Sequence, residues 1–270
     1  MGLWIGVEMS TAANQRFLTY KEKVRIEKIV RTLQKKVWIY AGRPRGIAIK
    51  DLFSPERIAK FLGYYYDEKE SLNDPLDPKN TETAGIIDSR NKTILISYQF
   101  STVVRLFTAA HEIGHAVLHP NGVYHRDKPK NGSIKYHRDI KEQEADYFAA
   151  CLLMPRKTVL SYFENNFGRL PLAINTSTAF SLNPANPDSI LNTKRGDVEK
   201  YISSVTRYNS KKFDSLSEAF GVSPYAMSYR LEELKVISYI EVKKTSVTKT
   251  TQALTTTKSQ KKIMIVPSLW

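Results

Sequence analysis

Apolar residues recur at helical spacing in long stretches of the chain and form short β-branched runs between them. Stretches with a period of three to four residues predict amphipathic helices that bury one face. These stretches are residues 14–39, 54–62, 101–118 and 139–154. Two β-branched runs, 84–88 and 92–97, flank a short polar turn and predict a hairpin. The pattern predicts an α+β fold in which a small mixed or antiparallel sheet packs with helices.

The pattern changes twice after the second strong helix, and the changes predict three parts. Residues 1–165 are expected to form the main body, and residues 67–83 within it read as a loop. Residues 166–240 are expected to form a helical module, in which 171–192 is rich in Pro, Asn, Ser and Thr and reads as a polar loop. Residues 241–270 read as a basic tail of low complexity.

Part of the helical module has the pattern of a helix-turn-helix. Residues 216–220 predict one short helix, Gly221 to Ser223 predict a turn, and Pro224 with its capping Ser223 predicts the start of a second helix. Arg230 stands beside Glu232 and Glu233 on that second helix, whereas helices that read DNA are usually clearly basic. A structural or protein-docking role is therefore favoured, with DNA binding as the alternative.

Net positive charge is concentrated at the two ends of the chain. The net charge is +14, and residues 1–50 carry 11 basic and 3 acidic side chains. Such ends suit an acidic partner or nucleic acid, although runs of charge are more often solvated faces. A single cysteine, Cys151, excludes an internal disulfide. The first ten residues lack a basic region and a long apolar run, so no signal peptide is expected and a cytoplasmic location is predicted.

The strongest chemical signal is the run His111-Glu112-Ile113-Gly114-His115. Residues four apart share one face of a helix, so both imidazoles can reach one metal ion, and Glu112 is placed to act as a general base. A catalytic zinc site needs a third protein ligand and an open position. His119 is eight residues from His111, about 12 Å along a helix, and is too far to complete the site.

The third ligand is expected from the helix over residues 139–154. Glu142 and Asp146 share a face of that helix with two alanines, which would allow close approach to the first helix. Glu142 is therefore the preferred third ligand, with Glu144 as the alternative. Asp146 is placed to orient a ligand histidine through its second ring nitrogen. Zinc suits this donor set best, with iron or manganese as alternatives.

The two helices together resemble the ImmA/IrrE family of metallo-endopeptidases. The matching runs are Phe107 to His119 and Glu142 to Pro155, and the E-x-x-A-D pattern resembles that of glutamate-zincins, in which the first glutamate binds zinc. The resemblance implies a zincin-like peptidase body that cleaves a peptide bond in a protein, such as a helix-turn-helix repressor of a mobile element or stress operon. It also implies that the strand at 92–97 is an edge strand that pairs with substrate.

Two other functions remain open from the sequence. The chain would be a DNA-binding regulator if the helical module reads DNA, or a catalytically silent module if it only binds a repressor. No residue is assigned to oxyanion stabilisation, for which Tyr136, His137 and Tyr147 are candidates by position only.

Overall fold

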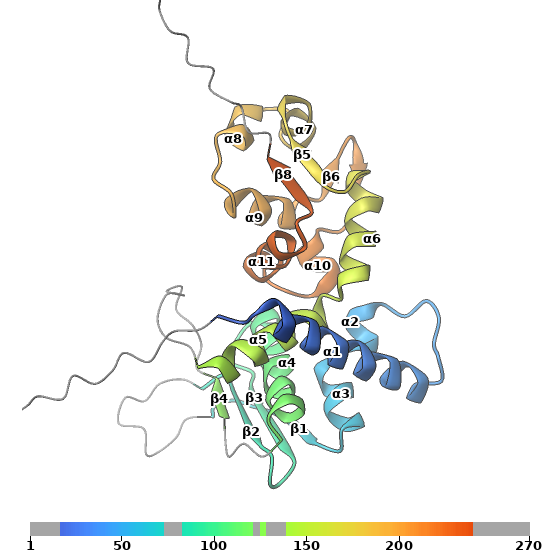
Figure 1. Cartoon of the computed structure of the whole chain (residues 1–270), viewed down its shortest axis with the longest axis vertical. Coiled ribbons are helices and arrows are strands. Elements are labelled where there is room, and N and C mark those ends of the chain that lie inside the picture. The colour runs from blue at the N-terminus through green and yellow to red at the C-terminus, as the bar shows by residue number, and fades with distance from the viewer. Residues whose placement is uncertain (1–16, 73–82, 121–124, 128–138, 240–270) are drawn as a thin grey trace, which may run out of the picture. The chain divides into compact units, whose positions relative to one another are not determined.

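The computed structural model describes residues 17–72, 83–120, 125–127 and 139–239. The first nine elements of the chain form a small sheet and the helices packed around it (Figure 1). They are α1 (Tyr20–Tyr40), α2 (Ile49–Leu52), α3 (Pro55–Phe61), β1 (Tyr65–Lys69), β2 (Gly85–Asp88), β3 (Thr93–Ser97), α4 (Thr102–Leu118), β4 (His125–Asp127) and α5 (Ile140–Leu153). The predicted α+β class is confirmed.

The sheet is mixed and has the strand order β1-β3-β2-β4. The predicted hairpin is present, because β2 and β3 pair antiparallel, but β3 also pairs parallel with β1. The prediction that β3 is an edge strand is therefore wrong. Strand β1 falls partly in the range predicted to be a loop. Its residues are exposed or half-buried, and a mostly exposed strand lacks the apolar alternation by which strands are recognised.

Helix α4 covers the sheet, and α5 packs along α4. Helix α4 contacts both β2 and β3, and α1 packs on α5 (Figure 1). A capping box between Thr19 and Glu22 begins α1. Phe17, which the helical pattern included, precedes the helix and is 83% exposed. The stack of α1, α5, α4 and sheet places the residues of the HExxH run in the interior.

The remaining elements form a second group in sequence. They are α6 (Arg156–Phe167), β5 (Leu172–Ile174), α7 (Thr176–Leu182), α8 (Pro187–Leu191), α9 (Asp197–Ser204), β6 (Arg207–Tyr208), β7 (Lys211–Lys212), α10 (Leu216–Phe220), α11 (Pro224–Leu234) and β8 (Ile237–Tyr239). Strand β5 pairs parallel with β8, and β6 pairs antiparallel with β7.

The prediction of a polar loop over 171–192 is wrong, because this segment forms β5, α7 and α8. Its polar residues cap the helices: the Asn175 side chain accepts a hydrogen bond from the Thr178 N–H, and the Asn186 side chain accepts one from that of Ser189. Some of its apolar residues, among them Leu172 and Ile190, are buried. Polar composition here reflects capping rather than irregular structure.

The two helices predicted at 216–220 and 224–234 are present as α10 and α11. The Ser223 hydroxyl accepts a hydrogen bond from the Ala226 N–H, and Gly221 has the left-handed conformation at the turn. Arg230, however, is only 2% exposed, and its Nε donates to the backbone oxygen of Met154. Because this guanidinium is enclosed, α11 does not present the cation that a DNA-reading helix would need.

Candidate metal centre

Helix α4 carries both histidines of the HExxH run in the interior. His111 and Glu112 are 0% exposed and His115 is 1% exposed. Buried neighbours on the same helix, including Ala109, Ala110 and Ile113, make this face apolar and hold it against the sheet and α5. Buried imidazoles and carboxylates need polar partners. The question is therefore which groups face these side chains.

Close contact between α4 and α5 brings carboxylates to the histidines. Gly114 stands where the helices meet: a Cβ atom at this position would lie 3.1 Å from both the Cα and the carbonyl oxygen of Ala145. Those are backbone atoms, so a side chain at residue 114 would push the helices apart. The small residues Gly114 and Ala145 thus set the separation at which Glu142 reaches α4.

His111, His115 and Glu142 form one compact cluster. The two Nε2 atoms lie 3.0 Å apart, and the Glu142 carboxylate oxygens lie 3.3 Å from the His111 Nε2 and 3.2 Å from the His115 Nε2. Ligands held about 2 Å from a tetrahedral ion are about 3.3 Å from one another. The donor set and its spacing therefore fit a single ion of the zinc type.

Electrostatics favour the charged form of Glu142. Burial raises the pKa of this carboxyl, but hydrogen bonds and charge interactions with His111 and His115 outweigh burial and hold the pKa well below its ordinary value. Asp146, one turn further along α5, places its Oδ1 3.0 Å from the His111 Nδ1. A carboxylate can only accept, so Nδ1–H donates and the lone pair of Nε2 faces the cluster.

The alternative ligands lie elsewhere. Glu144 forms an ion pair with Arg25, and its second oxygen lies 3.4 Å from the His119 Nε2. His119 is thus directed to Glu144 rather than to the cluster, and burial lowers its pKa. The Tyr147 hydroxyl donates to Glu233 at 2.5 Å, which takes it away from the cluster. Tyr136 and His137 lie outside the described residues.

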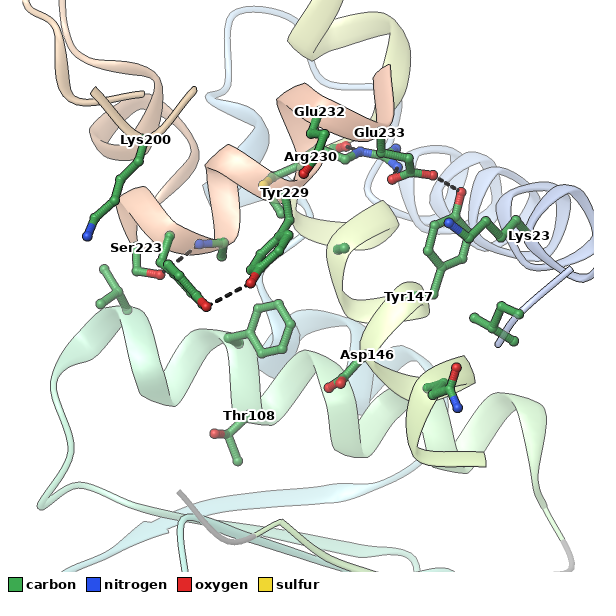
Figure 2. Close-up of a pocket in the computed structure, with 18 of the residues that line it drawn as sticks. Lys23, Thr108, Asp146, Tyr147, Lys200, Ser223, Tyr229, Arg230, Glu232 and Glu233 are labelled. Atoms are coloured by element: carbon green, nitrogen blue, oxygen red, sulfur yellow. Dashed lines mark hydrogen bonds and ion pairs between the residues drawn. The ribbon is translucent and has the colours of Figure 1, made fainter. Parts of the chain in front are cut away.

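A cavity of about 1000 Å³ opens beside the cluster, between α4, α5 and α11. Asp146 on α5, Thr108 on α4 and Tyr229 on α11 are among the residues that line it (Figure 2). Its wall also contains apolar side chains, among them Val104 and Phe107. Asp146 both lines this cavity and contacts His111, so it connects the cavity to the metal-type cluster.

Known proteins resemble the part of the chain that holds this cluster. Residues 73–173 match the peptidase M78 family model, described as an IrrE N-terminal-like domain. Over these residues the chain is similar to IrrE N-terminal-like domains. The predicted resemblance to the ImmA/IrrE family is confirmed over this range, which makes the domain metallopeptidase-like. "Uncharacterized immunity region protein 2" of Bacillus phage phi105 is 37% identical over 82 residues, which are 30% of this chain and 49% of the relative. The match therefore spans about half of that relative.

Two glycines of the matched region have a structural role that their sequence patterns do not indicate. Gly114 stands inside the HExxH run, and Gly85 begins β2. A Cβ atom on Gly85 would lie 2.5 Å from the Thr108 Cγ2 and 3.3 Å from the Glu112 Cγ, so this glycine lets α4 lie close to β2. No pattern within one helix or strand reveals such contacts, because they depend on how two elements meet.

No helix of the described part of the chain is both long and apolar enough to cross a membrane.

Proposed function

We propose that this chain is a metal-dependent endopeptidase with its centre at His111, His115 and Glu142. The observation that carries the proposal is that one atom from each of these side chains lies within 4.8 Å of the others. Zinc is the proposed ion, because two imidazoles and one carboxylate are the protein ligands of many hydrolytic zinc sites. When bound, zinc would supply Lewis-acid chemistry, polarising a peptide carbonyl and lowering the pKa of water.

The side chains around the ion would divide the remaining work. Glu112 would accept a proton from the attacking water and deliver it to the leaving amine. Support for this role comes from its place beside His111 on α4 and from its full burial. Asp146 would hold the His111 ring in one tautomer and one orientation. The cavity beside Asp146 would receive apolar side chains of the substrate, since Val104 and Phe107 line it.

A protein that represses transcription is the proposed substrate. The support is the ImmA/IrrE resemblance together with the phage relative, whose name places it in an immunity region. We therefore propose that cleavage removes a repressor of a mobile element or stress operon. The repressors encoded beside the gene for this chain are the first substrates to test.

The decisive experiment compares Glu112→Gln with the unchanged chain. Each protein is incubated with a candidate repressor, with and without chelator, and its zinc content is measured. The unchanged chain should cleave only without chelator, whereas Glu112→Gln should keep its zinc and lose about 10²- to 10⁴-fold in rate. Glu56→Gln is a matched control, since Glu56 is an exposed residue that pairs with Lys60. Equal cleavage by Glu112→Gln and the unchanged chain would rule out this mechanism.

The same proteins, tested in addition for binding to the repressor and to duplex DNA, distinguish the two alternatives. Binding of the repressor without cleavage under any metal condition would indicate a catalytically silent module. Retention of DNA through α11 would indicate a regulator, but the burial of Arg230 disfavours that reading. Every member of the HExxH run and of the carboxylate pair is present, which favours the peptidase.

A further inference from the structure

Helix α1 has a strongly basic face on the side opposite to the core. Ile26, Val30, Leu33 and Val37 are buried on one side. Six cations are exposed on α1: Lys21, Arg25, Lys28, Arg31, Lys35 and Lys36. The chain after the helix adds exposed Arg43, Arg45 and Lys50. From residue 28 to residue 50 there are seven basic residues and no acidic one. We call the exposed cations of residues 21–50, other than Arg25, the α1 basic face.

The carboxylates described close to this face are directed to other groups. Glu22 bonds back to Thr19 at the start of the helix, and Glu27 points inward to the Tyr147 hydroxyl. Glu144 pairs with Arg25 instead. Within the ranges that the structure describes, no ion pair joins Lys28, Arg31, Lys35 or Lys36 to a carboxylate. Unopposed cations in such number raise the local potential and attract a polyanion.

We propose that the α1 basic face binds the phosphate backbone of duplex DNA. Helix α1 has 21 residues and is about 31 Å long, close to one turn of the double helix. Lys21, Lys28 and Lys35 recur every seven residues and form a stripe with steps of about 10 Å. A row of cations with this reach suits contacts to phosphates rather than to base edges, so the binding would not depend on sequence.

The chemistry of the face favours DNA over two other anionic partners. A protein partner usually needs a desolvated apolar or aromatic anchor at the centre of the interface, and the centre of this face is made of Lys, Arg and Thr32. A membrane-binding helix inserts its apolar side, whereas the apolar side of α1 is packed on the core. This surface also differs from α11, whose Arg230 is buried, so DNA binding would not use the helix-turn-helix pattern.

The test measures binding of the full chain to a labelled 30-base-pair duplex of arbitrary sequence over a range of salt concentrations. The variant Lys28→Gln, Arg31→Gln, Lys35→Gln removes three cations from the α1 basic face. The control Arg156→Gln, Lys157→Gln, Lys212→Gln removes three exposed cations from other elements, so both variants have the same net charge. Circular dichroism verifies that both remain folded.

We expect the α1 variant to bind at least about tenfold more weakly at 0.1 M salt, and its log–log salt slope to fall by about 2.7. The control should change far less. Equal losses in the two variants would mean that the total charge and not this face binds DNA, and would overturn the proposal. The proposal would also be overturned if the unchanged chain bound acidic-lipid vesicles or single-stranded RNA more tightly than the duplex, and if the α1 variant lost that tighter binding. Neither readout depends on peptidase activity.

Discussion

Two polar clusters lie beside α5, and they differ in the source of their positive charge. In the cluster of His111, His115 and Glu142, the basic partners of the carboxylate are imidazoles. Imidazole is a weak base and a good metal ligand, so a divalent cation from solution is the natural counterpart of this cluster. Such a cluster is suited to bind a metal ion and to support a reaction at that ion.

The second cluster contains a permanent cation of its own. Arg230 on α11 lies 2.7 Å from Glu233 and 3.7 Å from Glu27, and Tyr147 on α5 donates to Glu233. Arg keeps its charge at any pH at which the protein folds, so the chain itself supplies the cation that pairs with these two carboxylates. The comparison shows that half-buried carboxylates alone do not indicate a metal site, because the identity of the basic partner decides between binding and structural roles.

Removing the internal cation should have the largest effect on stability. Arg230→Met leaves the half-buried Glu27 and Glu233 without their cation and removes a fully buried hydrogen-bonded guanidinium, which should lower the free energy of unfolding by about 3 kcal/mol. The loss should be the same in zinc and in chelator, because Arg230 does not contact the metal-type cluster. Urea unfolding measures both values, and Lys212→Met, at an exposed position, serves as the control. A loss below about 1 kcal/mol would show that the second cluster is not structural.

Asp146→Asn should affect zinc and not the fold. An amide in place of the carboxylate weakens the acceptor that orients His111, so zinc affinity should fall by about 10- to 100-fold. Competition with a chromophoric chelator measures the affinity, and Asp188→Asn at an exposed position is the control. An affinity within about threefold of the unchanged chain would contradict the role given to Asp146.

Gly114→Ala tests whether helix separation sets the metal geometry. Alanine favours an isolated helix by about 1 kcal/mol, yet here its Cβ would meet the backbone of Ala145. We expect a net destabilisation of about 1–3 kcal/mol together with weaker zinc binding. Thr32→Ala, on the exposed side of α1, should leave both quantities nearly unchanged. A stabilised protein with unchanged zinc affinity would contradict the close-contact argument.

Cys151 should give the smallest effect. Burial raises the pKa of this thiol to about 12, and the side chain is 3% exposed next to the second cluster. At pH 8 about one thiol in 10⁴ would be ionised, so Ellman's reagent should react very slowly with the native chain and rapidly after unfolding. Rapid reaction of the native protein would mean that the interior around Arg230 opens readily.

Local sequence patterns predict helices better than they predict which side chains from different elements contact one another. Helices α3, α4, α5 and α11 follow from helical spacing and capping residues, because those signals lie within a few residues of one another. Strand β1 was missed because its residues are mostly exposed, and the elements at 172–191 were missed because their caps are polar. Burial of Arg230 depends on Glu27 of α1 and on the backbone oxygen of Met154, and a pattern within one helix cannot reveal either contact.

The cluster itself was easier to anticipate, for a physical reason. Residues four apart on a helix must share a face, so the HExxH spacing fixes two ligand positions before any tertiary contact is known. Glu142 could be named because Ala145 and Asp146 follow it at helical spacing, which marks the face of α5 that approaches α4. The role of Gly114 could not be named, because it depends on the distance between two helices.

Zinc titration of the unchanged chain against Glu142→Ala is the most direct test of the central claim. The unchanged chain should bind one zinc ion, and zinc at 1,000 times its dissociation constant should raise the free energy of unfolding by about 4 kcal/mol. Glu142→Ala should lose most of that increase, whereas Glu112→Gln should keep it. If Glu142→Ala binds zinc as tightly as the unchanged chain and gains the same stability, then His111, His115 and Glu142 are not the ligand set.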